Sequence, residues 1–228
     1  MDRALSMKRK KSKAINYYPI FFNLRSKTAV VVGGGKVALR KVRTLLECGA
    51  DLTVVGPKPC PGIVKLSKDG LIHLIQRDYE PGDLKDAVIA VVCTDMKKVN
   101  RKVAADAKRA GVLANVVDDL KASDFIIPSF FRRGNLTIAV STSGVSPALA
   151  RKIRAKLEKA FGEEYGSLLS IIGEVRSAIK ENGIIADVEE WQDALDLDLL
   201  IGLVHGGQEE KAKVFLLDRL KASAIKHK

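Results

Sequence analysis

Three small residues at fixed spacing give the sequence its clearest chemical signal. Gly33, Gly35 and Ala38 occupy the small-residue positions of the pattern G-x-G-x-x-G/A. In that pattern the first small residue allows a tight turn, the second lets the backbone approach a pyrophosphate, and the third lets a helix pack closely on a strand. The free N–H groups and the positive dipole end of the helix then hold the phosphates. The spacing therefore predicts a site for a dinucleotide.

The residues around these glycines supply the strand and the helix that the pattern requires. The apolar run from Ala29 to Val32 is typical of a strand buried on both faces of a parallel sheet. From Lys36 onward, apolar residues recur at spacings of three and four, which predicts a helix that Gly49 ends. The second strand, 51–55, leads into Gly56-Pro57-Lys58 without the acid that binds a ribose hydroxyl. The choice between NAD and NADP stays open, because Lys58 could lie beside a 2′-phosphate or face solvent.

A carboxylate after a later strand is the candidate for acid–base chemistry. Strand and helix patterns alternate up to residue 117, which predicts a doubly wound α/β domain with right-handed crossovers. Ligands in such sheets bind at the carboxyl ends of the strands, so we expect Thr94 and Asp118 to lie beside the glycine turn. Asp118 directly follows the strand 112–117, where it could act as a general base or cap a helix or loop. Asp119 is its local competitor.

The sequence lacks the motifs of several other enzyme classes. The three histidines are scattered without H-x-x-H spacing, and the three cysteines show no metal-ligand spacing. We therefore expect reduced thiols and no resident metal. No G-x-S-x-G elbow or phosphate-binding lysine loop occurs, which disfavours hydrolases and kinases.

Composition and charge limit the kinds of partner that we expect the protein to bind. The 228 residues are 46% hydrophobic, enough to bury a core, and no apolar run approaches the roughly 20 residues of a membrane span. We expect a cytoplasmic protein that does not bind membranes. The net charge of +12 suggests nucleic acid, but about five of these charges lie near the N-terminus and the rest are spread thinly. We therefore expect no nucleic-acid partner and favour a solvated surface or a polyanionic small substrate.

The pattern changes after residue 124. Two β-rich runs, 125–131 and 136–141, flank Arg132-Arg133-Gly134-Asn135 and predict a hairpin. Ser146-Pro147 predicts an N-cap and first-turn proline. The helix that follows carries an apolar face made of Leu149, Ile153, Leu157 and Phe161. The rest is predominantly helical, with breaks at Gly183 and between Gly202 and Gly207.

These patterns predict four segments. The aromatic run 17–24 contains a proline and predicts an edge segment or packing arm. The segments we expect are a basic disordered tail at 1–16, a dinucleotide-binding domain at 17–124, a hairpin region at 125–145 and a helical domain at 146–228.

Six short motifs give the chain a family resemblance. They are Y-P-I-F at 18–21, V-V-G-G-G at 31–35, C-T-D at 93–95, N-V-V-D at 115–118, S-D-F-I-I-P-S at 123–129 and A-V-S-T-S-G-V-S-P-A-L-A-R at 139–151. In this order and spacing, residues 17–160 resemble the siroheme synthase dehydrogenase/ferrochelatase module.

The resemblance implies a fold and an activity. The fold is a Rossmann-type doubly wound parallel sheet followed by a dimerisation hairpin, about 125–144, and a helical C-terminal domain. The activity is that of a precorrin-2 dehydrogenase, which oxidises precorrin-2 to sirohydrochlorin with NAD, in a homodimer. Asp118 matches the essential aspartate of the family, as general base or as the group that orients the macrocycle. The cofactor-binding residues we expect are Gly33, Gly35, Lys36, Val37, Pro57, Lys58, Thr94, Asn115 and Val116.

Three questions stay open at this stage. Some family members also insert Fe²⁺ into sirohydrochlorin, and the sequence does not separate them from members that only oxidise. Thr142-Ser143 stands where relatives often carry Ser-Gly. The serine of that loop is phosphorylated in one branch of the family, so such regulation is in doubt here. Finally, a regulatory module that binds NAD without chemistry would share the glycine turn.

Overall fold

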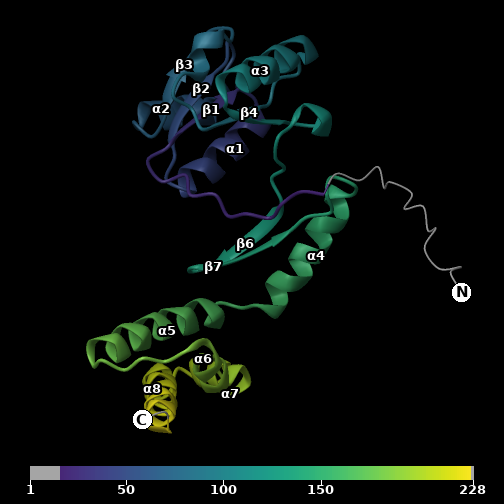
Figure 1. Ribbon diagram of the computed structural model, residues 1–228. Helices are drawn as coiled ribbons and strands as arrows, with labels where there is room; N and C mark the ends of the chain where they lie inside the picture. Colours follow the sequence, from purple (N-terminus) through teal and green to yellow (C-terminus); the bar gives the residue numbers. More distant parts are fainter. Residues whose placement is uncertain (1–15, 227–228) are drawn as a thin grey trace, which may run out of the picture. The chain divides into compact units, whose positions relative to one another are not determined.

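The chain divides into two compact units. The computed structural model describes residues 16–226, with side chains through residue 222, and its units are Met1–Ile127 and Pro128–Lys228 (Figure 1). The division falls three residues after the boundary expected at 124, and the further boundary at 145 stays a prediction. The tail expected at 1–16 lies outside the described residues, except for its last one.

A parallel sheet of five strands forms the centre of the first unit. Its strands are β1 (Thr28–Val32), β2 (Asp51–Val55), β3 (His73–Ile75), β4 (Ile89–Val92) and β5 (Leu113–Val116). They lie in the order β3-β2-β1-β4-β5, and every neighbouring pair is parallel. The doubly wound sheet expected from the sequence is confirmed. Its topological switch point, where such sheets bind ligands, lies at the carboxyl ends of β1 and β4.

Three helices and two short 3₁₀ turns cover this sheet. They are α1 (Lys36–Glu47), α2 (Pro61–Lys68), η1 (Pro81–Leu84), α3 (Lys97–Ala110) and η2 (Leu120–Ala122). α1 and α2 pack on one face of the sheet, where Val31 and Val42 are buried, and α3 packs on the other, around Val30 and Val103 (Figure 1). Apolar groups on both faces explain why the β1 run shows no polar alternation. The N-terminal run 17–24 forms no strand, and it exposes Tyr18 and Phe21.

Side chains, rather than a sixth strand, cover the outer edge of β5. The carboxylate of Asp124 accepts a hydrogen bond from the Ala114 N–H at 2.8 Å, and the Ser123 hydroxyl accepts one from the Val116 N–H at 2.9 Å. These bonds occupy donors that would otherwise be open to another strand. They hold residues 123–125 against β5. The prediction that a strand begins at residue 125 is therefore wrong.

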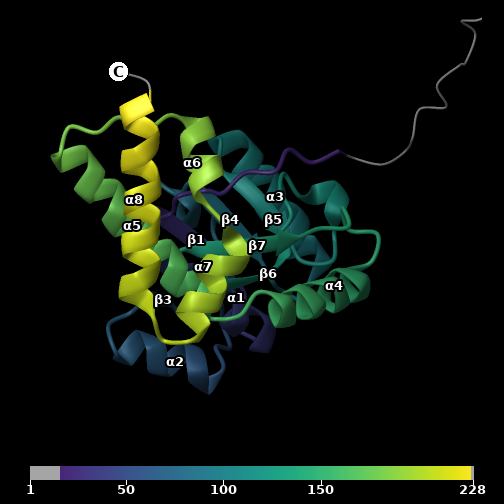
Figure 2. The ribbon, with the colours of Figure 1, turned by 90° about the horizontal axis from the view of Figure 1, so that it is seen from below.

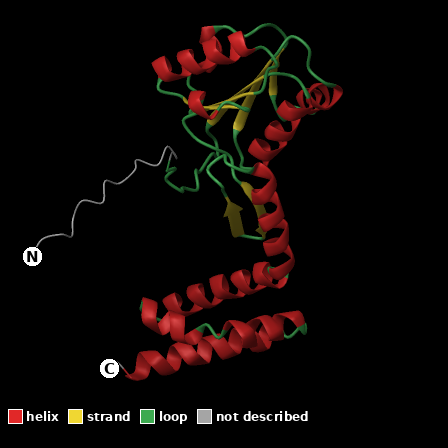
Figure 3. Cartoon of the chain, turned by 90° about the vertical axis from the view of Figure 1, so that its right-hand side faces the viewer, coloured by secondary structure: helices red, strands yellow, loops and turns green. Residues whose placement is uncertain are grey.

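The second unit begins with an antiparallel hairpin and continues with helices. The hairpin comprises β6 (Ser129–Arg133) and β7 (Leu136–Val140). The helices are α4 (Pro147–Ala160), α5 (Glu164–Glu181), α6 (Val188–Ala194), α7 (Leu197–His205) and α8 (Glu209–Lys226) (Figure 3). The expected four-residue turn is too long, because Arg132 and Arg133 pair within β6 and only Gly134-Asn135 connect the strands. Gly134 has φ +53, a left-handed conformation that suits glycine.

Arg133 fastens the hairpin to the end of α4. Its guanidinium donates hydrogen bonds to the carbonyl oxygens of Phe161 and Glu158, both at 3.1 Å. These acceptors lie in the last turn of α4 and at its C-cap, where carbonyls lack helical partners. At the other end of α4 the Ser146 hydroxyl accepts from the Leu149 N–H at 3.2 Å, which confirms the predicted N-cap.

Helices α5 to α8 share a separate apolar core. Leu168, Val175, Leu200, Leu216 and Leu220 are buried in it. α8 packs against α5, α6 and α7 (Figure 2). The break expected from Gly202 onward is partly wrong, because Gly202 lies inside α7 and the chain turns at Gly207, with φ +69.

Replacing Asp124 by Ala tests the edge covering of β5. We expect the free energy of unfolding to fall by about 1 kcal/mol, because the Ala114 N–H loses a charged acceptor. Urea denaturation measures this change. The control is Asp95→Ala, which removes an exposed carboxylate without a hydrogen bond to the described residues and should stay within about 0.5 kcal/mol of the unmodified protein. Equal losses in both variants would contradict the assignment.

Candidate functional site

Two glycines allow three backbone segments to meet at the carboxyl edge of the sheet. Gly33 directly follows β1 and has φ +130. A Cβ at this position would lie 2.7 Å from the carbonyl oxygen of Cys93, the residue that follows β4. A Cβ on Gly34 would lie 2.7 Å from the Lys58 carbonyl oxygen, after β2. Any side chain at either position would force these backbones apart. Gly34 was not among the residues expected at the site, because the pattern leaves its position unspecified.

Gly35 differs from its two neighbours because a Cβ on it would meet no atom within 4 Å. It is the N-cap of α1, and no side chain caps the helix. The first N–H groups of α1, at Lys36 and Val37, have no intrahelical partner and lie on exposed residues. The first turn contains no acidic residue, and Ala38 is fully buried. This open space with free donors fits the pyrophosphate of a dinucleotide.

The loop after β2 is held against the glycine turn. The Cys60 N–H donates to the Gly34 carbonyl oxygen at 2.8 Å. Pro57 and Lys58 are exposed in this loop, and no carboxylate lies between residues 55 and 60. Their place beside the turn matches the ribose end of a dinucleotide site.

The remaining cofactor residues expected from the sequence also lie at this edge, but their side chains serve the fold. The Thr94 hydroxyl contacts the Asn100 amide and accepts from the Met96 N–H at 3.2 Å, just before α3. The Asn115 amide donates to the Phe125 carbonyl oxygen at 2.9 Å, and Val116 is buried in β5. Contact between these residues and a cofactor stays a prediction.

The structure separates the two neighbouring aspartates. Asp119 accepts hydrogen bonds from the N–H groups of Lys121 and Ala122 at 3.1 and 3.2 Å, so its carboxylate caps η2. Asp118 is exposed, and its carboxylate has no hydrogen bond or ion pair with the part of the chain that the structure describes. Its φ is +62, a conformation that is uncommon for a residue other than glycine and that is often found at functional sites. Asp118 is therefore the carboxylate available for chemistry.

Two further groups, Lys41 on α1 and the Cys93 thiol of the C-T-D motif, have shifted pKa values. Lys41 of α1 is half-buried, and burial lowers its pKa, whereas the charges of Cys93 and Asp118 raise it. Burial raises the pKa of the Cys93 thiol to about 11, although Lys41 and Arg40 lower it. Lys41 stands at a half-buried position of an amphipathic helix, where a sequence pattern alone does not distinguish a functional lysine from a solvated one.

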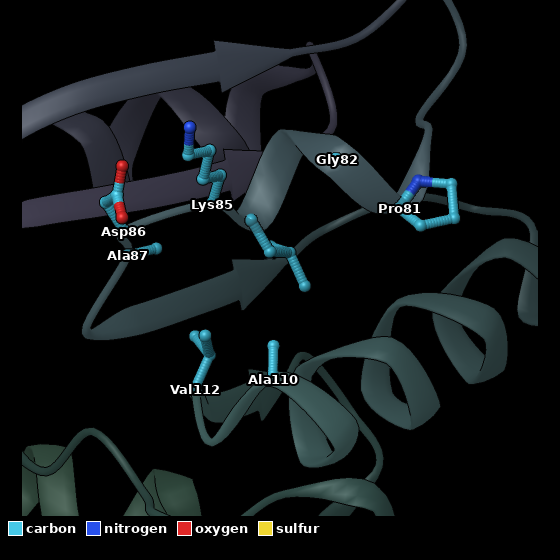
Figure 4. A pocket seen from close by; sticks show the side chains of 8 residues that line it. Pro81, Gly82, Lys85, Asp86, Ala87, Ala110 and Val112 are labelled. Atoms are coloured by element: carbon cyan, nitrogen blue, oxygen red, sulfur yellow. The ribbon is translucent and has the colours of Figure 1, made fainter.

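A hollow at the opposite edge of the sheet does not suit the dinucleotide. It has a volume of about 380 Å³ and lies between η1, the end of α3 and the residues before β4 and β5 (Figure 4). Lys85, Asp86, Ala110 and Val112 are among its lining residues. The C-terminal end of a helix carries partial negative charge, which disfavours phosphate there.

The described residues form neither a metal-binding cluster nor a membrane-spanning helix. Between residues 16 and 226, no three histidine, cysteine or acidic side chains come together as ligands for a metal ion. No helix in that range combines the length and apolar character needed to cross a bilayer.

Comparison with known proteins agrees with this organisation. Residues 20–129 match a family described as putative NAD(P)-binding, and residues 133–160 match the sirohaem biosynthesis protein central family. The chain is 39% identical over 210 residues to the siroheme synthase of Chromobacterium violaceum, and 42% identical over 202 residues to siroheme synthase 1 of Aeromonas salmonicida. The chain belongs to the siroheme synthase N-terminal module family.

The family match covers most of this chain but only part of its relatives. The two alignments cover 91% and 87% of this chain, and 44% and 43% of the synthases. The chain thus spans less than half the length of these curated relatives. A solved structure titled SirC, precorrin-2 dehydrogenase, shares the fold of this family module, with a TM-score of 0.69 and 24% identity. That alignment covers 90% of this chain and all of the other.

The family match and the open turn identify the class of cofactor. The first unit of this siroheme synthase module is a domain for a nicotinamide dinucleotide, NAD or NADP. The open space at Gly35 and the first turn of α1 fit its pyrophosphate, and contact between these residues and the dinucleotide stays a prediction.

Substitutions at two glycines separate binding from folding. Gly35→Ala should fold normally, because its Cβ enters open space, and should weaken NAD binding at least about tenfold by occupying the place of the pyrophosphate. Gly33→Ala should lower the free energy of unfolding by about 1–3 kcal/mol, because it adds strain at φ +130 and a backbone clash. Calorimetric titration with NAD and thermal denaturation measure the two effects. Normal NAD affinity in a folded Gly35→Ala variant would contradict the placement of the pyrophosphate.

Proposed function

We propose that this module is a precorrin-2 dehydrogenase that uses NAD and forms sirohydrochlorin. The reaction removes a hydride and a proton from precorrin-2, and the dinucleotide is reduced as the conjugation of the macrocycle extends. The observation that carries the proposal is the position of Asp118, an uncommitted carboxylate that follows β5 at the same edge of the sheet as the open glycine turn. The similarity to siroheme synthases and the fold shared with a precorrin-2 dehydrogenase support it.

Different residues of the chain have different roles in this reaction. When bound, the nicotinamide supplies the hydride acceptor. The N–H groups of Lys36 and Val37 would hold the pyrophosphate of the dinucleotide, and the loop with Pro57 and Lys58 would contact its ribose. Asp118 accepts the proton that leaves precorrin-2 or orients the macrocycle for its loss, and such general-base catalysis is worth about 10²–10⁴-fold in rate.

The charges of α1 suit a polycarboxylate substrate. This helix carries Lys36, Arg40, Lys41 and Arg43 against a single acid, Glu47. Its positive N-terminus lies at the same edge of the sheet as Asp118. A positive field of this kind raises the local concentration of anionic ligands and is weakened by salt.

An anaerobic absorbance assay tests the proposed activity. Precorrin-2 is supplied with NAD, with NADP and with neither, and Fe²⁺ is added after oxidation. Formation of sirohydrochlorin that requires NAD and is slower with NADP would support the proposal, whereas a preference for NADP would overturn the choice of cofactor. Metal insertion faster than the protein-free rate would add a ferrochelatase activity. NAD binding without oxidation would favour a regulatory module instead.

The two aspartates provide a matched pair for the catalytic role. Asp118→Asn should keep the fold and NAD affinity, and should lower kcat for precorrin-2 by about 10²–10⁴-fold, because the proton acceptor is lost. Asp119→Asn should keep stability within about 0.5 kcal/mol, because the Asn amide oxygen can accept the same N–H bonds, and should leave kcat within about threefold. Steady-state kinetics and thermal denaturation of both variants measure these effects. A normal kcat in Asp118→Asn would remove Asp118 from the mechanism.

We also propose that the module works as a homodimer formed through the hairpin region and α4. The support is an apolar stripe beside the hairpin. Val145, Leu149 and Ile153 are 84%, 50% and 38% exposed, and they follow one another at intervals of four residues. Two of them belong to the apolar helix face noted in the sequence, so another surface must cover the stripe if it is to leave water.

Charged substitutions on this stripe test the homodimer. Leu149→Glu together with Ile153→Glu should shift the protein from dimer to monomer, because burial of two unpaired carboxylates at an interface is unfavourable. The control is Val214→Glu on α8, which is 54% exposed and lies outside the proposed interface. Sedimentation velocity over a range of protein concentrations measures the change. A protein that is monomeric before any substitution would contradict the proposal.

A further inference from the structure

The end of β2 lacks the acid that selects an unphosphorylated ribose. In sites specific for NAD, that acid stands about 20 residues after the glycines and binds the 2′-hydroxyl. Here the last residue of β2, Val55, is apolar and buried, and Gly56 follows it. A Cβ on Gly56 would lie 3.2 Å from backbone atoms of Gly33 and Gly34, so a side chain there would crowd the glycine turn. Neither position therefore offers a carboxylate that would repel a 2′-phosphate.

Lys58 is the next charged residue along the chain, and its backbone is fixed against the glycine turn. A Cβ on Gly34 would lie 2.7 Å from the Lys58 carbonyl oxygen and 2.8 Å from the Cα of Pro59. The Cys60 N–H bond to the Gly34 carbonyl oxygen, at 2.8 Å, maintains this close packing. The main chain of Lys58 thus contacts the residue next to Gly35, which borders the open space for the pyrophosphate.

The side chain of Lys58, in contrast, is uncommitted. It is exposed, and its ammonium has no hydrogen bond or ion pair with residues 16–222. A second cation, Arg77, follows the neighbouring strand β3, but its guanidinium donates to the Asp83 carboxylate at 2.8 and 2.6 Å. A lysine is a compact point charge on a flexible stem, so it binds phosphate without a fixed geometry. Lys58 is therefore the cation of the loop after β2 that is available to a ligand.

We propose that Lys58 determines specificity at the ribose end of the site, where its ammonium binds the 2′-phosphate of NADP, so that the module binds NADP as well as NAD. The absence of an acid removes the repulsion, and the lysine supplies an attraction. The inference deepens the proposed function, on which it rests for the role of the bound dinucleotide in oxidation. It concerns the adenosine end of the dinucleotide, whereas the hydride is accepted at the nicotinamide end.

Calorimetric titration with each dinucleotide, without precorrin-2, tests the role of Lys58. The unmodified protein should bind NADP with a Kd within about tenfold of its Kd for NAD. Lys58→Met should raise the Kd for NADP about tenfold, because the charged contact with the phosphate is lost, and should leave the Kd for NAD within about twofold. Lys58→Arg should keep both constants within about threefold of the unmodified protein, since it returns the cation.

A charge reversal and a matched control complete the series. Lys58→Glu places an acid at the ribose end and should raise the Kd for NADP at least about a hundredfold, with the Kd for NAD within about threefold. Lys68→Met removes an exposed lysine from the last turn of α2 and should leave both constants within about twofold. A wider than tenfold gap between the dinucleotides in the unmodified protein would overturn the inference. A Kd for NADP that Lys58→Met leaves unchanged, or an equal rise for NAD, would do the same.

Ionic strength gives an independent readout of the same contact. Salt weakens the attraction between an exposed ammonium and a phosphate. Added salt should therefore raise the Kd for NADP more than the Kd for NAD in the unmodified protein and in Lys68→Met. This difference should shrink in Lys58→Met, because the responsible cation is gone. A difference of the same size in Lys58→Met would contradict the assignment.

These readouts separate the two proposals. Absence of precorrin-2 oxidation with either dinucleotide would refute the proposed function, and the titrations would still decide whether Lys58 binds the 2′-phosphate. Oxidation with NAD, together with failure to bind NADP, would support the proposed function and overturn this inference.

Discussion

The close approach of three backbone segments at Gly33 and Gly34 is the constraint on which the site depends. At these positions a Cβ would come within 2.7 Å of the carbonyl oxygens of Cys93 and Lys58. The absence of side chains lets the loops after β2 and β4 lie against the turn after β1, and the Cys60 N–H bond to Gly34 holds one of them there. The same packing leaves Gly35 facing open space, so one short sequence both closes the fold and opens the phosphate site. Gly34, which the packing of the fold requires, is therefore next in sequence to Gly35, which borders the space for the phosphates.

The outer edge of the sheet is covered by side-chain hydrogen bonds. β5 is an edge strand, and side chains of the segment that follows it occupy its outward N–H groups. The same segment begins with Asp119, whose carboxylate caps η2. The backbone on both sides of Asp118 is therefore fixed by hydrogen bonds, which allows Asp118 itself to hold φ +62 at a cost of about 1–3 kcal/mol. Its carboxylate remains free because its neighbours make the structural bonds.

Much of the first unit could be predicted from the sequence, because its signals are local. The apolar runs of a buried parallel sheet and the glycine that ends α1 identify elements without knowledge of their neighbours, and the expected strand 51–55 agrees with β2 to the residue. The segment 125–128 was expected to be strand because of its composition. Its first residue lies instead beside β5, where the distant Asn115 donates a hydrogen bond to the Phe125 carbonyl oxygen. Gly202 was misjudged for a similar reason, since Leu200 and Val204 are buried in the core of α5 to α8 and carry the helix past it.

The site was harder to predict than the fold, because proximity in space decides what a charged side chain does. Apart from the family resemblance, nothing in the sequence separates Asp118 from Asp119, and the hydrogen bonds of η2 distinguish the structural carboxylate from the free one. Lys41 shows the same difficulty, since α1 holds three other cations and only its half-burial, which follows from the packing of α1 through Ala38 and Val42, distinguishes it from them.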